Sequence, residues 1–231
     1  LAAEGIAAPV MNLVILAISG LCIGAGIFMS ERFGAKDMIS FRKSLSAVLK
    51  AGILLSLLIA VPGILLTPMI LRLLAVPEDI FRITSIYQRI TFIGVPFTFI
   101  YNALASAMKS VGDSKRPLRF LAICSVLNIV LDLILLGVFH LGITTSALTT
   151  VFAQVFSAFL AARCMIKEMP DLIPRREEWK TDTVLLKRVM KYGLPSAFQQ
   201  AVQPIGKLLI QSQVNLLGVS TIAAFNAVSR I

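Results

Sequence analysis

Long apolar stretches alternate with short polar, basic segments along the whole chain. Each stretch has about 20 residues or more, which at a helical rise of about 1.5 Å per residue crosses a hydrocarbon core of about 30 Å. Leu, Ile, Ala and Val fill them without a period of two, a pattern that indicates helices and not an outer-membrane barrel. We therefore predict an all-α integral membrane protein, a polytopic helix bundle. The predicted spans are 9–29, 45–74, 80–108, 120–139, 141–165 and 189–217, and a seventh begins at Thr221.

Composition agrees with a membrane class and argues against soluble enzyme chemistry. Hydrophobic residues make up 57% of the chain and charged residues 15%, and mean hydropathy is +0.87; soluble domains carry about 25% charged residues. The sequence holds no G-x-S-x-G, P-loop, G-x-G-x-x-G or H-E-x-x-H motif. Cys22, Cys124 and Cys164 lack the spacing of a metal or disulfide site and are predicted to be small packing residues. We expect no enzyme and no cofactor.

Positive charge is distributed unevenly between the connections. The net charge is +10, and most Lys and Arg residues lie between the first and second, third and fourth, and fifth and sixth spans. That alternation is the positive-inside rule. It predicts that the first residue lies outside, that the 168–187 connection is cytoplasmic, and that the protein crosses the plasma or inner membrane several times. The net positive charge thus reflects membrane topology. We expect a lipid bilayer as partner and no nucleic acid.

The longest connection, 167–187, divides the chain. It contains Pro170, Pro174 and the only tryptophan, Trp179, which we expect at the cytoplasmic interface. A second cytoplasmic segment, Gly112-Asp113-Ser114, predicts a tight turn between the third and fourth spans. The expected organisation is a first bundle over 1–168, a linker over 169–186 and the start of a second bundle over 187–231.

Both ends of the sequence lie in or beside apolar segments. No basic signal-peptide region precedes Leu1. The matching triplets Ile6-Ala7-Ala8 and Ile222-Ala223-Ala224 each follow a short external segment, at an offset of one six-helix unit. We expect an internal fragment that runs from the second helix of one unit to the second helix of the next.

Asp132 is a lone carboxylate inside the apolar stretch 120–139, and Asn128 lies one helical turn before it. A carboxylate within a membrane helix costs roughly 2.5–3.5 kcal/mol on insertion scales, so it is retained where it is paired, protonated or ion-bound. Asp132 is therefore a candidate functional residue.

Counting from the outer helix ends places two further polar residues level with Asp132. Tyr87, Asp132 and Thr150 each lie eight residues from the predicted outer end of their span, which is a depth of about 12 Å at the helical rise. Asp132, Asn128, Thr150 and Tyr87 together offer the hard oxygen ligands that Na⁺ prefers, and Asp132 alone could carry a proton. The alternative is an interhelical hydrogen-bond cluster. The counted pairs are Tyr87 from Asp79, Asp132 from His140, and Thr150 from Gly142.

The last predicted span is unusually polar. Polar side chains recur every four residues, which on a helix of 3.6 residues per turn gives a slow spiral. These side chains could line a substrate cleft. Alternatively, they could make packing contacts between helices, with Lys207 paired to a carboxylate from a missing helix. Its members are Gln199, Gln203, Lys207, Gln211 and Asn215, and the cleft candidates are Gln200, Gln203, Lys207, Gln211 and, from the third span, Arg89.

An ordered set of short motifs resembles the multidrug and toxic compound extrusion (MATE) family. The resemblance implies a twelve-helix transporter of two six-helix lobes, of which this chain supplies five helices of the N-lobe and the first one to two of the C-lobe. The family's N-lobe cation site matches Asn128, Asp132, Thr150 and Tyr87; its first-helix Asp has no counterpart here, and Gln199 and Gln200 occupy the region of a seventh-helix Glu. The motifs are Gly24-Ala25-Gly26, Phe33-Gly34-Ala35-Lys36-Asp37, Tyr87-Gln88-Arg89-Ile90, Gly112-Asp113-Ser114, Asn128-Ile129-Val130-Leu131-Asp132 and Ala147-Leu148-Thr149-Thr150-Val151-Phe152-Ala153-Gln154.

The function implied by the resemblance is export of small amphipathic, often cationic compounds by a Na⁺- or H⁺-coupled antiporter, monomeric when full length. Na⁺ would bind at Asp132, Asn128 and Thr150. Arg89 and Lys207 keep open a lipid-linked oligosaccharide flippase of the same superfamily, which needs a more cationic cavity. A truncated, non-transporting membrane protein is the third alternative.

Overall fold

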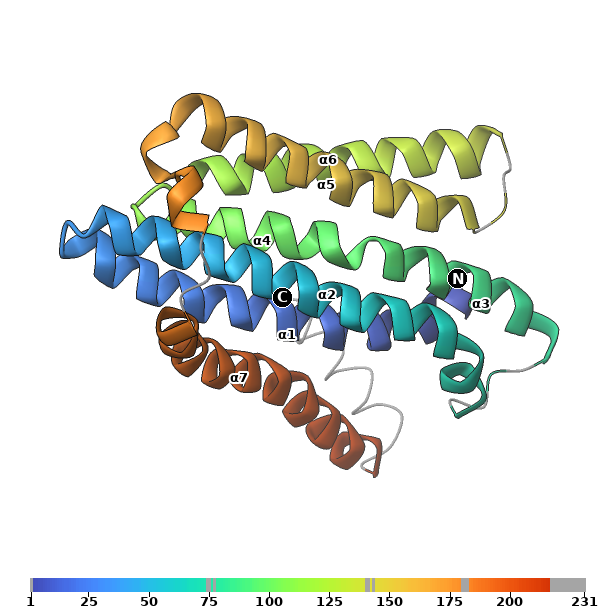
Figure 1. Ribbon diagram of the computed structural model, residues 1–231. Coiled ribbons are helices and arrows are strands. Elements are labelled where there is room, and N and C mark those ends of the chain that lie inside the picture. Colours follow the sequence, from blue (N-terminus) through green and yellow to red (C-terminus); the bar gives the residue numbers. More distant parts are fainter. Residues whose placement is uncertain are drawn as a thin grey trace.

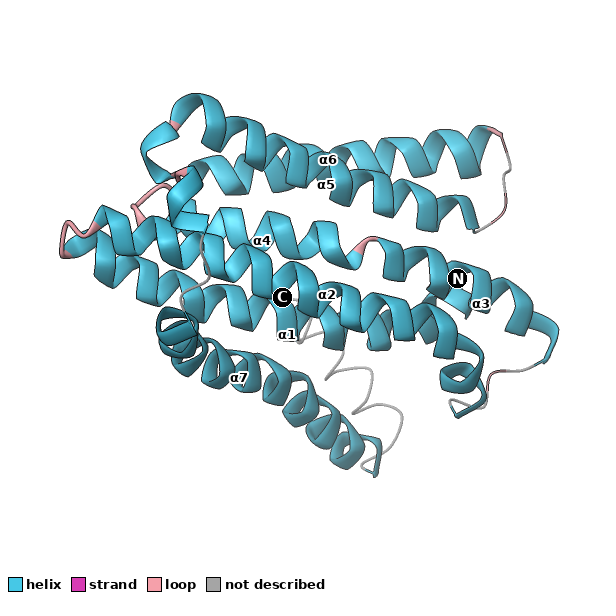
Figure 2. Ribbon diagram, viewed as in Figure 1, coloured by secondary structure: helices cyan, strands magenta, loops and turns pink. Residues whose placement is uncertain are grey.

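The computed structural model describes the backbone of residues 2–73, 76, 78–139, 142, 144–179 and 183–216, and the side chains of all of these except 2–10, 183, 201 and 203–216. Helices make up nearly all of this part of the chain, and it contains no strand (Figure 2). His140 and the seventh span predicted from Thr221 lie outside it. The helices are α1 (Ala2–Gly34), α2 (Met38–Leu73), α3 (Glu78–Ile93), α4 (Val95–Ser110), α5 (Lys115–Asp132), the π-helical segment η1 (Leu133–Val138), α6 (Thr144–Glu168), the 3₁₀ turns η2 (Pro170–Leu172) and η3 (Arg176–Trp179), and α7 (Thr183–Leu216).

Five of the predicted spans are present as long apolar helices, which confirms the all-α membrane fold class. Among the residues that the structure describes, five segments are long and apolar enough to cross a membrane, and the sixth predicted span falls within α7. The helices extend past the apolar stretches at their basic ends, because Lys and Arg side chains continue a helix into the interface at little cost. The five segments are Met11–Gly34, Met38–Leu73, Glu78–Ser110, Lys115–Val138 and Thr144–Glu168.

The third span is broken at Gly94 into α3 and α4, which the apolar pattern did not predict. Pro96 lies in the first turn of α4, where its missing N–H and its ring disfavour continuation of the preceding helix. The absent side chain of Gly94 also leaves room for a neighbour, because a Cβ there would lie 1.7 Å from Oε1 of Gln154 on α6. The break thus admits a polar group from another helix.

The two short turns lie where polar breaks were predicted. Gly112 has φ +92°, a conformation that L side chains rarely adopt, and the amide of Asp113 donates to the carbonyl of Met108. Lys36 closes the turn between α1 and α2 with φ 57°. The turn after α4 is held to the end of α6, since Arg116 pairs with Asp113 and Glu168, at 2.7 and 2.8 Å.

The helices form one bundle around α1, which packs against α2, α3, α4 and α7 (Figure 1). α5 and α6 form a pair on the far side of α4 from α7, and α6 links that pair to α3 and α4. Large apolar side chains such as Phe41, Met29, Leu45 and Met108 are fully buried between the helices. α5 is covered mainly by α6, so most of its apolar face is exposed.

α1 and α7 approach each other through glycine. A Cβ added at Gly20 would lie 2.4 Å from the Cα of Ala197. A Cβ added at Gly24 would lie 2.3 Å from the carbonyl oxygen of Tyr192. Small residues four apart on one helix let two membrane helices pack backbone to backbone. The hydroxyl of Tyr192 also donates to Glu31, at 3.3 Å.

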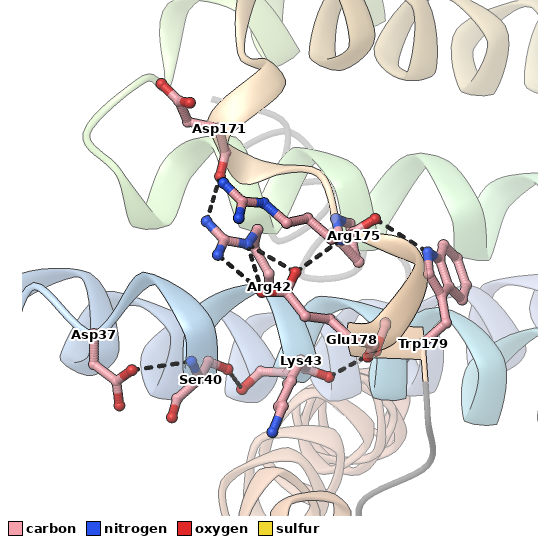
Figure 3. Close-up of polar contacts among 11 residues, drawn as sticks. Asp37, Ser40, Arg42, Lys43, Asp171, Arg175, Glu178 and Trp179 are labelled. Atoms are coloured by element: carbon pink, nitrogen blue, oxygen red, sulfur yellow. Dashed lines mark hydrogen bonds and ion pairs between the residues drawn. The ribbon is translucent and has the colours of Figure 1, made fainter.

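The segment between α6 and α7 is fixed to the basic end of α2 (Figure 3). Arg42 and Glu178 are both buried, and Nε and Nη2 of Arg42 each donate to a carboxylate oxygen of Glu178 at 2.8 Å. Arg42 also donates to the carbonyl of Asp171, and Ser46 to that of Glu178. Hydrogen bonding from Arg42 holds the pKa of Glu178 below its ordinary value of 4.5. We call this set of contacts the linker clamp.

Candidate functional site

The candidate cation site is built on the last turn of α5. Asp132 is the final residue of α5, and the wider π-helical turn of η1 starts at the next residue. Such π-helical turns are frequent at functional sites. Asp132 is half-buried, and its carboxylate faces α6, where Thr149 donates to Oδ1 at 2.5 Å and Ser146 donates to Oδ2 at 3.3 Å. Both carboxylate oxygens are therefore held by hydroxyl groups from one neighbouring helix.

Asn128 completes the α5 side of the site. It lies four residues before Asp132 on the same helix face, and its amide nitrogen donates to Oγ1 of Thr149 at 3.3 Å. With the nitrogen turned toward Thr149, the amide oxygen of Asn128 offers a further acceptor beside the carboxylate. Asn128 and Asp132 thus meet at the same hydroxyl.

Thr150 lies on another face of the same turn of α6, and Tyr87 lies on α3. The Thr150 hydroxyl donates to the carbonyl of Ser146 on its own helix, at 2.9 Å. Tyr87, buried on α3, packs against Ala147. α5 and α3 thus both contact the turn of α6 from Ser146 to Thr150, while a shared cation site of Asp132, Asn128, Thr150 and Tyr87 stays a prediction.

Sequence counting did not identify Ser146 and Thr149, the two residues that contact Asp132. Depth along a helix does not fix the direction of a side chain, and adjacent residues point about 100° apart. The pair of hydroxyl residues three apart on one helix, facing the Asn128 and Asp132 pair four apart on the next, was the available signal.

The Thr149 hydroxyl has a single proton and two acceptors within reach. Its oxygen lies 2.5 Å from Oδ1 of Asp132 and 2.9 Å from the carbonyl of Ser146. A hydroxyl has one donor and two lone pairs, so rotation toward Ser146 would turn a lone pair toward Asp132. The site can therefore present a donor to a free carboxylate or an oxygen ligand to a bound cation.

The ligand set suits a monovalent ion better than a structural metal. Within the described ranges, no three His, Cys, Asp or Glu residues lie close enough together to hold a metal ion. One carboxylate in contact with two hydroxyl oxygens supplies hard ligands with a single negative charge. That charge matches Na⁺ or H⁺.

A groove adjoins the site along the contact of α5 and α6. It has a volume of about 150 Å³, and Asn128 and Thr150 line it together with Cys124, Ser125 and Gln154. Thr150 and Asn128 thus share a lining although their hydroxyl and amide groups have different partners. Asn128 belongs to both the cluster and the groove, whereas Asp132, Ser146 and Thr149 are not part of the groove lining.

A second buried polar side chain, that of Gln88, lies on α3. The Gln88 side chain is fully buried, and neither its amide nitrogen nor its amide oxygen has a hydrogen-bond partner among the described residues. A buried unpaired amide costs about 1–3 kcal/mol. Gln88 follows Tyr87 directly, so the polar interior of the bundle continues from the site into α3.

The cleft candidates are only partly described. Arg89 is exposed on α3, and Gln200 is half-buried on α7, which packs against α1 and α2. Gln203, Lys207 and Gln211 lie on the helical backbone of α7, but their side chains are outside the described set. Whether these residues share a cleft stays a prediction.

The fold and the site together define a class: an all-α, multi-pass membrane protein with one carboxylate held inside a helix bundle. Residues 1–134 match the family model described as MatE. The chain belongs to the MATE family, as the sequence motifs predicted.

Two curated relatives and a solved structure illustrate the similarity. The chain is 32% identical over 97% of its length to the "Probable multidrug resistance protein YpnP" of Bacillus subtilis (strain 168) and covers 51% of it. It is 29% identical over 96% of its length to "Probable multidrug resistance protein YoeA" of the same strain and covers 50% of it. A crystal structure of "MATE in the straight conformation" superposes with a TM-score of 0.89 at 23% identity, over 100% of this chain and 52% of that one. The chain spans about half the length of the curated relatives it matches.

Proposed function

We propose that this chain forms the cation-binding half of an antiporter that exports small amphipathic, often cationic compounds in exchange for Na⁺ or H⁺. The observation that carries the proposal is the Asp132 carboxylate, placed on a membrane helix and held by Thr149 and Ser146. The names of the curated relatives support drugs as cargo. Residues 1–168 would form the first lobe and α7 would begin the second, in a protein of the plasma membrane that works as a monomer, with the linker in the cytoplasm.

The geometry supports a specific effect of ion binding. Without an ion, Thr149 donates its proton to Asp132 and so joins α6 to α5. When Na⁺ binds the carboxylate, the Thr149 proton turns to the carbonyl of Ser146 and its oxygen becomes a ligand. A proton on Asp132 likewise removes the charge that attracts the hydroxyl. Occupancy therefore changes the contacts between α5 and α6.

Coupling requires that cargo prefer one of the two occupancy states. A ligand shifts a conformational equilibrium only by its difference in affinity for the two states. If the ion-bound arrangement favours release, entry of Na⁺ or H⁺ from outside drives cargo out, and the lobes then reopen inward. The two ions compete for the same carboxylate, so either gradient could drive transport.

The test is dye efflux from whole cells that express the complete protein carrying this sequence, with and without an inward Na⁺ or H⁺ gradient. Asp132→Asn keeps the size of the side chain and removes its charge, so gradient-dependent efflux is expected to disappear at normal membrane expression. Ser125→Ala, a change in the adjoining groove that leaves Asp132 and its partners intact, serves as the matched control. Full gradient-driven efflux by the Asp132→Asn protein would refute the proposal.

A further inference from the structure

An apolar cavity lies between α7, the basic halves of α1 and α2, and Phe99 of α4, away from the Asp132 site. It has a volume of about 310 Å³, and its walls include Ala25, Ala51, Phe99 and Val189. Hydrocarbon side chains and glycine form the whole lining. The neighbouring helices are shown side by side in Figure 1.

The cavity opens along the side of α2 that faces away from the bundle. Leu54 and Leu58 both line it, and their side chains are 61% and 62% exposed. Further exposed leucines, Leu65 and Leu66, continue the same apolar surface of α2. An apolar cavity that opens onto an apolar membrane-facing surface is accessible from the hydrocarbon of the bilayer.

Lysines gather at one end of this cavity only. Lys187 and Lys191 follow the lining residues Leu186 and Met190 on α7, and they line a shallow groove that shares these two residues with the cavity. Both lysines are exposed. On α2, Lys50 lies between the lining residues Val48 and Ala51. Three cations thus flank a cavity whose own lining carries no charge.

Trp179 lies beside Lys50 and indicates where the membrane–water boundary lies on this side of the bundle. Lys50 donates to the carbonyl of Trp179, and its ammonium group lies 5.8 Å from the centre of the indole ring. Trp and Lys are typical of the membrane–water boundary. From Lys50 to Leu58 is eight residues, about 12 Å along the helix, which is most of the depth of one leaflet of a core of about 30 Å.

Glu178, which contacts α2, and Glu31, which contacts α7, are both already paired. Glu178 is bound by Arg42, and Glu31 pairs with Arg32 and accepts a hydrogen bond from Tyr192. The exposed Lys187 and Lys191 therefore place positive charge beside an apolar cavity. That combination matches an anionic amphiphile.

We propose that the cavity between α2 and α7 binds one anionic phospholipid of the leaflet on the basic side, with its phosphate at Lys187 and Lys191 and an acyl chain against Ala51 and Leu55. Basic pockets between membrane helices on the cytoplasmic side bind anionic headgroups, and each Lys near an anionic surface contributes about a fivefold gain in affinity. The bound lipid would lie against the contact between α1 and α7, on which the glycines Gly20 and Gly24 lie.

The test is native mass spectrometry of the complete purified protein titrated with palmitoyl-oleoyl phosphatidylglycerol or phosphatidylcholine. The double variant Lys187→Gln/Lys191→Gln is expected to lose about 30-fold in phosphatidylglycerol affinity and to keep its phosphatidylcholine binding. Lys109→Gln/Lys115→Gln removes the same charge from another basic segment and is expected to bind as the unmodified protein does.

A second variant tests the acyl part of the site. Ala51→Phe fills the cavity without a change of charge, and phosphatidylglycerol affinity is expected to fall about tenfold, roughly the contribution of two buried methylenes. Circular dichroism verifies that each variant is folded. The proposal is overturned if the unmodified protein binds neither lipid or binds both equally, if the two lysine pairs have equal effects, or if Ala51→Phe binds normally. A cavity filled by another segment of the protein gives the first of these results.

Discussion

Thr149 on α6 donates a hydrogen bond to Asp132 on α5, with 2.5 Å between the two oxygens. The contact joins two helices through the carboxylate at which we propose that the coupling ion binds. Asn128 bonds to the same hydroxyl at 3.3 Å. Thr149 therefore makes the shorter of the two hydroxyl contacts between α6 and Asp132, and it alone of the two also bonds to Asn128.

Replacing Thr149 separates its role from that of Thr150. Thr149→Val removes the hydroxyl that contacts both Asp132 and Asn128, and a hydrogen bond to a charged group contributes about 1.5–3 kcal/mol. The concentration of Na⁺ or H⁺ that half-saturates transport is expected to rise about tenfold or more. Thr150→Val removes only a bond to its own helix, so a shift of less than about threefold is expected. A larger effect at Thr150 than at Thr149 would contradict this assignment.

Hydropathy and charge predicted the membrane helices and the two polar turns, because burial in lipid constrains composition over 20 residues at a time. The break at Gly94 was missed because it interrupts no apolar run, although Pro96 was a visible signal. Thr149 was missed because a depth count gives height on a helix and not direction. The linker clamp joins Arg42 to Glu178, 136 residues apart, and no local pattern identifies such a pair.

The close contact of α1 and α7 predicts that two glycines on one helix respond in opposite ways to alanine. A Cβ at Gly24 would collide with the backbone of α7, so Gly24→Ala is expected to weaken the α1–α7 contact and lower the thermal unfolding temperature. Gly26 is the control, because its Cβ would meet Ser106 at an ordinary 3.4 Å. Gly26→Ala is expected to be neutral or stabilising, since Ala favours helix by up to about 1 kcal/mol. Equal unfolding temperatures for the two variants would show that the helices are not in this contact.

Removing one partner of the linker clamp is expected to destabilise the protein more than removing the other salt bridges. Arg42→Met leaves the Glu178 carboxylate buried without its partner, which costs about 3 kcal/mol. Arg32→Met breaks an exposed pair with Glu31 and is expected to cost less than about 1 kcal/mol. Thermal unfolding in detergent measures both, and limited proteolysis between α6 and α7 shows whether the linker is released. Protection of the linker in the Arg42→Met protein would argue against the clamp.

The lowered pKa of Glu178 predicts how the clamp depends on pH. Because the folded-state pKa lies below the ordinary value of 4.5, the contribution of Glu178 is fully present above about pH 4.5 and is lost as pH falls through the lowered pKa. Glu178→Gln cannot titrate. The difference in unfolding temperature between the unmodified protein and Glu178→Gln is therefore expected to be constant near neutral pH and to shrink in acid. A difference that grows as pH falls would mean that the pKa is raised instead.

The most direct test of the central claim uses the complete protein in proteoliposomes, with a fluorescent cationic substrate and an imposed Na⁺ or H⁺ gradient. For the unmodified protein, we expect the gradient to drive substrate against its concentration difference and substrate to drive ion movement in return. Asp132→Asn is expected to abolish both while Ser125→Ala preserves them. Gradient-driven accumulation by Asp132→Asn at the rate of the unmodified protein would show that Asp132 is not the coupling carboxylate.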